Sequence, residues 1–412
     1  MEPKLIVAGI DVHKKMLAVV VVDEANPQQA LEQRRFGSAA NELKEMAAWL
    51  TCYGVSEVVM ESTAQYWRPV WQALEPEFVP HLAQAQSNVG PRGRKSDFVD
   101  ALRLARRYLA GELRLSFVPD AEQRSWRGLA RSKHQKRRRR VELQNQIEAL
   151  LEENRIKLSS VITDLLGLTG IRILEALAAG ESDAVKMTAL AANNLKASTE
   201  ELAESLAAAP LAARGCKILA MHLEELALID RHIVALSQEL GQALHSHEQA
   251  VLRLCQVPGV REDAAAQMIA ELGPEAAVFD SPEQLASWIG VCPGREESAR
   301  QSKSNRSPKG NRTMRRLLNQ IAWGAVRTKN SYFRQLFQRW TPRLGVHKAL
   351  WAVAHRIARL IWKLLHEKVD YIEYGALALD PGAIARRATR LIKQLRRLGY
   401  TAELKPTPVA AQ

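Results

Sequence analysis

Two short apolar runs near the N-terminus predict a buried β-hairpin. Leu5 to Ile10 and Leu17 to Val22 are apolar throughout, and the short turn VHKK lies between them. Apolar runs of this length, joined by a tight turn, are typical of paired strands inside a core. The first run ends at Asp11, so a carboxylate is expected at the end of the first strand. His13 is expected to be a turn residue with no catalytic role.

The residues that follow alternate between helical and strand patterns up to about residue 115. A helix is predicted over residues 43–50, a strand over residues 56–60 and a further short strand over residues 78–82. The strand at 56–60 leads directly into Glu61. Strands that alternate with helices in this way predict an α/β domain.

A second helix is predicted from Lys95 to Leu109. Ser96 is a suitable N-cap, and apolar residues recur after it at helical spacing. Asp97 and Asp100 stand three positions apart, so their carboxylates share one face of the helix. The helix macrodipole favours an acid at a helix start and accounts for Asp97 alone. The pair indicates a bound cation, because two like charges this close repel one another without one.

Four carboxylates are therefore candidates for one metal site. Asp11 and Glu61 end predicted strands, where a sheet presents side chains to a crevice. Asp97 and Asp100 lie on a helix that can pack beside that sheet. Oxygen ligands of this kind suit Mg²⁺ or Mn²⁺. Two such ions can hold the attacking and leaving oxygens of an in-line phosphoryl transfer.

The charge of the chain indicates a polyanionic partner. Its net charge is +13 and its pI about 9.7, which favours nucleic acid. The four cysteines are scattered without a CxxC pair, which argues against a zinc site or a disulfide framework and fits a reducing cytoplasm. No signal peptide and no membrane-spanning run is expected, so the predicted location is cytoplasmic, without a membrane partner.

The middle of the chain, residues 116–248, is predicted to be helical with a strongly basic start. Residues 133–140 read KHQKRRRR and continue into apolar residues at coiled-coil spacing. Such a run is often a solvated helix face, but its charge exceeds what solubility requires. Phosphate contact is therefore predicted for Lys133, Lys136, Arg137, Arg138, Arg139 and Arg140. Gly167 and Gly170 are expected to interrupt the helices, and the helices after them to form a spacer or a dimer arm.

The C-terminal part, residues 249–375, carries a second basic stretch. A Pro-Gly turn before a helix at 262–272 resembles a helix-hairpin-helix unit, whose turn offers N–H groups to a phosphate. Between Ser298 and Lys348 there are thirteen lysines and arginines and no acid, which is the pattern of a nucleic-acid-binding surface. The predicted phosphate contacts here are Arg295, Arg300, Lys303, Arg306, Lys309, Arg312, Arg315 and Arg316. Residues 376–412 form a basic tail that is expected to be frayed.

Two blocks of the sequence resemble one known family. The first consists of GIDVHKK at 9–15, VVMEST at 58–63 and KSDFVDA at 95–101, and the second of WIGVCPGREESARQSKSNRSPKGNRTMRR at 288–316. In this order they resemble the DEDD transposases of bacterial insertion sequences, the family numbered 110 with its 1111 subgroup. The first block also resembles Holliday-junction resolvases of the RuvC type. Arg300 stands where the transposase family usually has glycine.

The resemblance implies a fold for each part of the chain. Residues 1–115 would be a ribonuclease-H-like (RuvC-like) α/β domain that holds Mg²⁺ or Mn²⁺ through the four acids. Residues 116–248 would be a helical and coiled-coil dimerisation region, and residues 249–375 a mainly α-helical transposase domain. Composition alone does not separate Ser298 from Ser302, Ser304 and Ser307, but by the resemblance Ser298 falls on the family's nucleophile.

The resemblance also implies a reaction and its partners. Ser298 would form a covalent phosphoserine link during DNA strand exchange, activated by an adjacent metal. The partners would be donor and target DNA, a guide (bridge) RNA encoded by the element, and further copies of the chain in a dimer or tetramer. A RuvC-like nuclease that uses metal and water alone, and a non-catalytic nucleic-acid-binding protein, are the alternatives.

Overall fold

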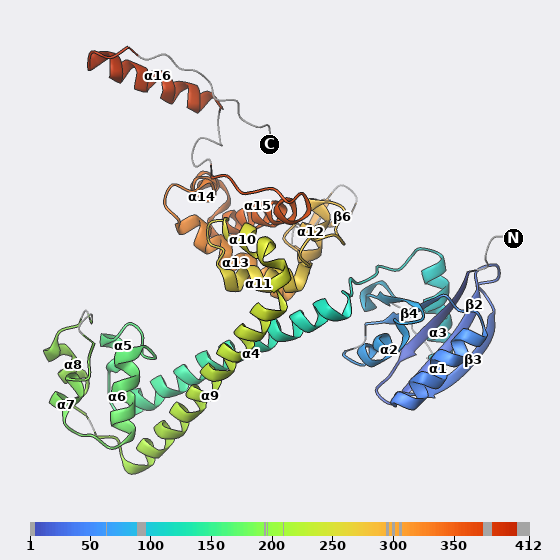
Figure 1. Cartoon of the computed structure of the whole chain (residues 1–412), viewed down its shortest axis with the longest axis horizontal. Coiled ribbons are helices and arrows are strands. Elements are labelled where there is room, and N and C mark those ends of the chain that lie inside the picture. Colours follow the sequence, from blue (N-terminus) through green and yellow to red (C-terminus); the bar gives the residue numbers. More distant parts are fainter. Residues whose placement is uncertain are drawn as a thin grey trace. The chain divides into compact units, whose positions relative to one another are not determined.

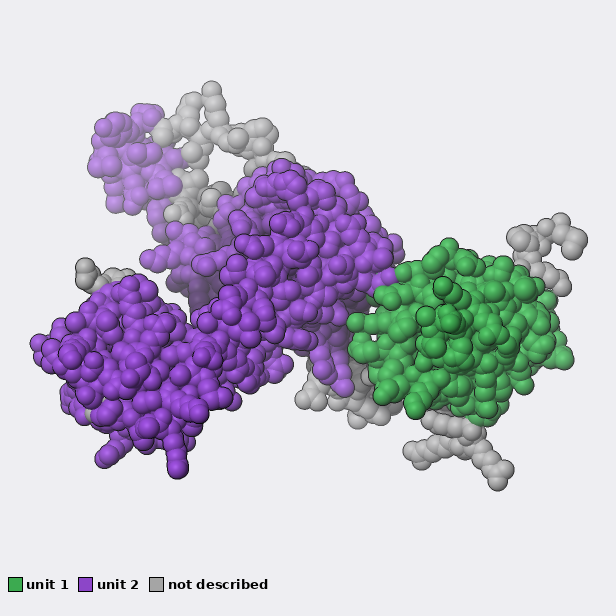
Figure 2. All heavy atoms as spheres, turned by 60° about the horizontal axis from the view of Figure 1, so that its bottom comes forward, with its two compact units in different colours: residues 1–119 green, residues 120–412 purple. Residues whose placement is uncertain are grey.

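The computed structural model of the protein divides into two compact units, Met1–Pro119 and Asp120–Gln412 (Figure 2). The structure describes residues 5–62, 64–88, 96–192, 195, 197–208, 210–293, 296–298, 301–304, 307–373 and 381–401. For residues 86, 296–298, 301–304 and 381–388 only the backbone is described. The domain boundaries that the sequence predicts at residues 115, 248 and 375 are not tested by this division into two units and stay predictions.

Unit 1 is an α/β domain built on one five-stranded mixed sheet (Figure 1). Its elements are β1 (Ile6–Val12), β2 (Met16–Asp23), β3 (Ala30–Gly37), α1 (Ala40–Cys52), β4 (Glu57–Glu61), α2 (Trp67–Leu74), β5 (Val79–Ala83), η1 (Ala85–Ser87) and α3 (Asp97–Leu109). The strand order is β3-β2-β1-β4-β5. β1, β2 and β3 are antiparallel neighbours, whereas β4 is parallel to β1 and β5 is parallel to β4.

Both faces of this sheet are covered, which explains why β1 and β2 are apolar along almost their whole length. One face packs on α1 and α2, and Ile10 and Met60 belong to that core. The other face packs on α3, whose Ala101 and Ala105 lie against the same cluster as Val7. Small residues on α3 let the helix approach β1 and β2 closely.

The sequence pattern does not predict β3 or α2. β3 reads ALEQRRFG and is mostly exposed, so it lacks the apolar alternation that marks a strand. It forms because its backbone pairs with β2 at the edge of the sheet. α2 is a short helix whose buried residues, Val70, Trp71 and Leu74, pack under the sheet. Tertiary contacts decide both elements.

Unit 2 is almost entirely helical. Its elements are α4 (Ala121–Glu153), α5 (Leu158–Val161), α6 (Leu168–Ala178), α7 (Ala184–Thr188), α8 (Thr199–Ser205), α9 (Ala213–Ala243), η2 (His245–His247), α10 (Glu248–Cys255), α11 (Glu262–Leu272), α12 (Pro282–Ile289), β6 (Glu296–Ser298), β7 (Gln301–Ser304), α13 (Arg312–Arg327), α14 (Tyr332–Leu344), α15 (Val346–His366) and α16 (Pro381–Arg397). No helix among the described residues is long and apolar enough to cross a membrane.

The long helices α4 and α9 run side by side in opposite directions (Figure 1). α4 contains the whole basic run and continues into the apolar residues Leu143 and Ile147, as predicted. Those residues share one core with Leu226 and Ile229 of α9. The coiled-coil register predicted for these helices stays a prediction.

Two expectations about unit 2 are wrong. Gly170 does not interrupt a helix but lies inside α6, where a Cβ would overlap the carbonyl group of Leu165. The break comes earlier, where α4 ends at Glu153. The basic tail is not frayed throughout, because residues rich in good helix formers make up α16.

In the C-terminal part, α15 packs on α10, α12, α13 and α14. Gly259, in the Pro-Gly turn before α11, has a φ of +86° and faces α13, where a Cβ would lie 2.6 Å from the backbone nitrogen of Ala325. The backbone of α13 thus packs directly against Gly259. The helix-hairpin-helix interpretation of the turn stays a prediction.

Candidate metal centre and nucleic-acid surface

The parallel pair β1 and β4 places two of the four predicted carboxylates side by side. Ile10 pairs with Met60 in the strand register, so Asp11 and Glu61 follow on neighbouring strands about 4.8 Å apart. Ile10 and Met60 are buried toward α1 and α2. Because side chains alternate along a strand, Asp11 and Glu61 point toward the opposite face, on which α3 lies.

Helix α3 brings the other two carboxylates to the same face. Asp97 and Asp100 lie in its first turn, just before Ala101. A Cβ on Gly9 would overlap the carbonyl oxygen of Ala101, so the backbone of α3 touches β1 two residues before Asp11. The absence of a side chain at Gly9 therefore sets how closely the acids of α3 approach β1.

Three side chains converge at the end of β1. His13 Nε2 lies 3.2 Å from Asp11 Oδ2 and 3.6 Å from Asp97 Oδ1. One ligand atom from each residue lies within 4.8 Å of the others, and no second group of this kind occurs among the described residues. Adjacent ligands of an octahedral ion with bonds of about 2.1 Å are about 3.0 Å apart, so the spacing suits one divalent ion.

Glu61 and Asp100 lie beside this group, each with another partner. Asp100 pairs with Arg103 at 2.7 Å, and Glu61 accepts a hydrogen bond from Asn88 at 2.9 Å. Burial raises the pKa of Asp11 most; His13 opposes that rise, and the charges of Asp100 and Asp97 add to it. A divalent cation would relieve this repulsion, so the donor set fits a hard metal ion.

His13 is the residue whose contacts with two of the acids the sequence analysis missed. It does lie in a turn, where its N–H donates to the carbonyl oxygen of Met16 at 3.0 Å. The turn also aims its ring at Asp11 and Asp97. The available signal was a histidine two residues after a strand-end aspartate, because a neutral imidazole is a common metal ligand.

Gly9→Ala is expected to weaken Mn²⁺ binding, measured by electron paramagnetic resonance titration, by about 10- to 100-fold. The new methyl group meets the backbone of α3 and must push Asp97 away from Asp11. Gly111→Ala is the control: Gly111 has a φ of +67° with open space around it, so the change strains the backbone without moving α3. Equal Mn²⁺ affinity in the Gly9→Ala and wild-type proteins would contradict the role given to α3.

Most of the basic run of α4 is neutralised inside the chain. The ion pairs, made with acids of α9 and α11, join Lys133 and Arg137 to Asp263, Arg139 to Glu225, and Arg140 to Asp230. These side chains tie α4 to its neighbours. The sequence did not indicate this role, because the acids lie far away along the chain.

Arg138 is the most exposed cation of the run. Its side chain is 69% exposed, and its acidic partner, Glu142, lies 3.7 Å away on the same helix. Lys136 has no acidic partner in the part of the chain that the structure describes. Nucleic-acid binding by the run stays a prediction, and these two residues are its best candidates.

The pKa of His134 is lowered by positive charges from two stretches that lie far apart in the sequence. Burial lowers its pKa most, and Arg316, Arg138 and Arg137 lower it further. Charges must lie close to a group to shift its pKa in this way. Gln267 accepts a hydrogen bond from Arg316 and donates one to Asp263, the partner of Arg137, so α4 and α13 meet here. Because Asp263 neutralises Arg137, the basic patch at this place, which we call the α4–α13 patch, consists of Arg138 and Arg316.

The remaining predicted contacts lie in or directly beside residues 290–310, which carry Ser298 and which we call the Ser298 segment. Lys309 and Arg312 are exposed, and Arg315 donates hydrogen bonds to backbone carbonyl groups at the ends of the segment. Arg295, Arg300 and Arg306 lie outside the described residues, and only the backbone of Lys303 is described.

Ser298 is the last residue of β6, where its backbone pairs with that of Gln301 in β7. Its side chain lies outside the described part of the structure. Its role as the nucleophile therefore stays a prediction.

Comparison with known families matches both regions of the chain. Residues 251–338 match the model of the "Transposase IS116/IS110/IS902 family", and residues 8–155 match a transposase model for the DEDD domain of IS110-type elements. The second match includes all four predicted acids. A probable family 20 transposase of Pseudomonas aeruginosa (strain PAO1) is 24% identical over 380 residues, which cover 88% of this chain and 97% of that protein.

Two solved structures of Thermus thermophilus RuvC, one in complex with a Holliday junction substrate, are similar to a smaller part of the chain. They cover 27% of this chain and 99% and 100% of their own, with 14% and 13% identity and a TM-score of 0.21 each. The strand order and the packing of unit 1 themselves define it as an α/β domain.

Proposed function

On the premise that this chain carries the DEDD region and the C-terminal region of IS110/IS116-type transposases, we propose that it cuts and rejoins DNA at a divalent-metal centre in unit 1. The observation that carries the proposal is the convergence of Asp11, His13 and Asp97, from β1 and α3, inside the region that matches the DEDD model. The ribonuclease-H-like assignment of this domain is part of the same proposal.

The residues of unit 1 would share the work of holding Mg²⁺ or Mn²⁺. Asp11 and Asp97 are already close, Glu61 is on the adjacent strand, and Asp100 becomes a ligand when it leaves Arg103. A bound ion would supply charge neutralisation at the phosphate and activate the attacking oxygen. His13 would orient Asp11 and Asp97 or ligate the ion itself.

Ser298 would supply the attacking oxygen. Its hydroxyl oxygen forms a bond to the DNA phosphorus, the bond from phosphorus to one DNA oxygen breaks, and that DNA end leaves as a hydroxyl. The phosphoserine link keeps the phosphodiester energy, so a second strand can be joined without an external energy source. Support for this role is the family resemblance of the block at 288–316 and the match of residues 251–338.

The basic residues of the chain would bind donor and target DNA and a guide (bridge) RNA encoded by the element. Base pairing would read the sequence, while the protein contacts backbones. The α4–α13 patch and Lys136, Lys309 and Arg312 are the described candidates for these contacts. We place the protein in the bacterial cytoplasm, where it would act on nucleoid DNA as a dimer or tetramer.

The experiment that tests this function combines purified protein, Mg²⁺ or Mn²⁺, RNA transcribed from the element and labelled DNA that contains the element ends. A strand break with a protein–DNA adduct that survives denaturation is expected. A break without an adduct would favour the second candidate, a RuvC-like hydrolytic nuclease. That candidate is favoured by one observation: the converging ligands all lie within unit 1. Absence of any metal-dependent cleavage would contradict both and leave a nucleic-acid-binding protein.

Arg138→Gln is expected to weaken RNA and DNA binding and to lower the slope of log affinity against log salt by about one, as for one lost phosphate contact. Arg140→Gln is the matched change, because Arg140 lies on the same helix but pairs with Asp230 at 2.7 Å. Its slope should stay at the wild-type value. Filter binding over a salt series measures both, and equal slopes in all three proteins would show Arg138 to be a solvated residue only.

A further inference from the structure

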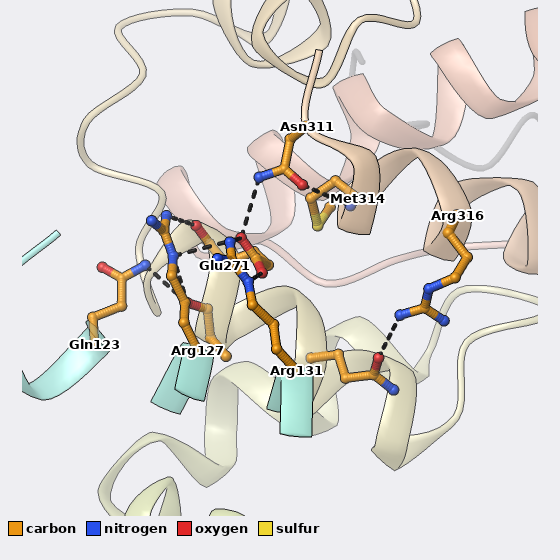
Figure 3. A network of polar contacts seen from close by, with 9 residues as sticks. Gln123, Arg127, Arg131, Glu271, Asn311, Met314 and Arg316 are labelled. Carbon is orange, nitrogen blue, oxygen red and sulfur yellow. Dashed lines mark hydrogen bonds and ion pairs between the residues drawn. The ribbon is translucent and has the colours of Figure 1, made fainter. Parts of the chain in front are cut away.

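A fully buried carboxylate lies in the C-terminal part, apart from the metal centre. Glu271, in the last turn of α11, is 0% exposed. Arg131 of α4 donates to both of its oxygens, from Nε at 2.8 Å and from Nη2 at 2.9 Å. Arg127 Nε lies 3.5 Å from Oε2. Two arginines of one helix thus surround one carboxylate of another (Figure 3).

The same side of α4 closes the C-terminal end of α11. The last carbonyl groups of a helix have no partner inside it. Gln123 and Arg127 each donate to the carbonyl oxygen of Ala270 at 3.2 Å, and Arg127 also donates to that of Glu271. Burial lowers the pKa of Arg127 to about 10 although Glu271 opposes the change, so Arg127 is charged near neutral pH. α4 and α11 are therefore joined around Glu271.

One further partner of Glu271 comes directly after the end of the Ser298 segment. Asn311 Nδ2 donates to Glu271 Oε2 at 3.2 Å. Asn311 Oδ1 accepts from the N–H of Met314 at 3.0 Å and so caps α13. Figure 3 shows the amide between these two partners. Both ends of the Asn311 side chain are thereby fixed.

Asn311 directly follows the Ser298 segment, at the place where the two ends of that segment meet. Its N–H donates to the carbonyl oxygen of Trp288 in α12 at 3.2 Å. Gly290 and Gly310 touch nearby, since a Cβ on Gly290 would lie 2.9 Å from Gly310 Cα. Arg315 also donates to the carbonyl oxygen of Gly290. The segment between the two glycines therefore leaves and re-enters the fold at one place.

We propose that Glu271 is a positioning residue that holds Asn311 and, through it, the base of the segment that carries Ser298. A buried ion pair adds little net stability compared with apolar residues of the same size, and in some proteins its role is to fix one arrangement of the groups around it. The arrangement selected here includes Asn311. This inference rests on the proposed role of Ser298 as the nucleophile. Its position matters for the rate because a shift of about 1 Å at a reacting atom can slow a reaction about 100-fold.

The test uses Asn311→Ser, because serine keeps an oxygen that can cap α13 but has no group that reaches Glu271. Formation of the covalent protein–DNA adduct is expected to slow by about tenfold or more, while DNA affinity stays within about twofold. Glu271→Gln should show the same split. The double variant should be no slower than the slower single variant, because residues that act as one unit are not additive.

Ser281→Ala is the control for loss of stability alone. Ser281 Oγ accepts the N–H of Gln284 at 3.2 Å and caps α12, so the variant removes a helix cap in the same unit but leaves Glu271 intact. Its adduct should form at the wild-type rate. A wild-type rate in Asn311→Ser, or rate losses that multiply in the double variant, would overturn the inference.

Limited trypsin digestion measures the segment without any chemistry on DNA. Cleavage at the lysines and arginines between Gly290 and Gly310 should be faster in Asn311→Ser than in the wild type or Ser281→Ala. Equal cleavage in all three proteins would also overturn the positioning role. If the wild type forms no adduct at all, the proposed function fails, whereas the digestion rates still decide whether Glu271 and Asn311 hold the segment.

Discussion

Asp11→Asn protein is expected to bind DNA and RNA as the wild type does and to cut DNA roughly 1000-fold more slowly. Asp97→Asn and Asp100→Asn should behave alike. The charge removed in each case faces the site of a metal ion and not a phosphate, so affinity for the nucleic acid is retained. Asp11 lies between His13 and the acids of α3. Asparagine has the same size, but it carries no charge and its NH₂ group donates hydrogen bonds where the carboxylate accepts them. Cleavage of labelled DNA in Mg²⁺, with binding measured in parallel, checks both parts of the prediction.

Asp23→Asn is the matched control for that prediction. Asp23 also ends a strand of the sheet, but it pairs with Ile6 at the opposite end of β1 from Asp11. Its carboxylate accepts the N–H of Ala25 at 2.9 Å in a local turn. Cleavage by Asp23→Asn should equal that of the wild type. Near-wild-type cleavage by both Asp11→Asn and Asp97→Asn would rule out the carboxylate site.

The parts of unit 1 that the sequence predicts are those with strong local signals. β1, β2 and the strand before Glu61 are short apolar runs, and α3 has helical spacing after Ser96. β3 has no such signal because pairing with β2 creates it. The sequence predicts that this helix can pack beside the sheet, but not how closely α3 approaches β1, since a glycine at position 9 indicates close packing only when the partner backbone is known.

Long-range partners explain why the basic residues were harder to interpret. The sequence shows six cations between Lys133 and Arg140, but Asp263 and Asp230 lie on other helices. Whether a cation faces solvent or an acid is decided by the packing of α4 on α9 and α11. Glu271 illustrates the same limit of local patterns: one glutamate at the end of a helix gives no sign that Arg131 and Asn311 will surround it.

Ser298→Ala is expected to abolish the covalent protein–DNA adduct, while Ser302→Ala and Ser304→Ala keep it. A serine hydroxyl is a weak nucleophile at neutral pH and needs activation. The nearest acids in the sequence are Glu296 and Glu297, and two carboxylates supply too few oxygen ligands to hold a divalent ion that takes about six. Ser298 alone should therefore be inert, and its reaction should require the carboxylates of an N-terminal domain.

Mixing two inactive proteins tests which protomer supplies those carboxylates. Ser298→Ala protein retains Asp11, and Asp11→Asn protein retains Ser298, so neither alone should form the adduct in Mg²⁺. If the site is shared between protomers, the mixture should recover part of the adduct, and the labelled DNA should be attached only to the Asp11→Asn chain, which a size tag distinguishes. No recovery would place Ser298 and the metal centre in one protomer. An adduct that persists in Ser298→Ala alone would show that another residue is the nucleophile, and the requirement for assembly would then have to be sought elsewhere in the chain.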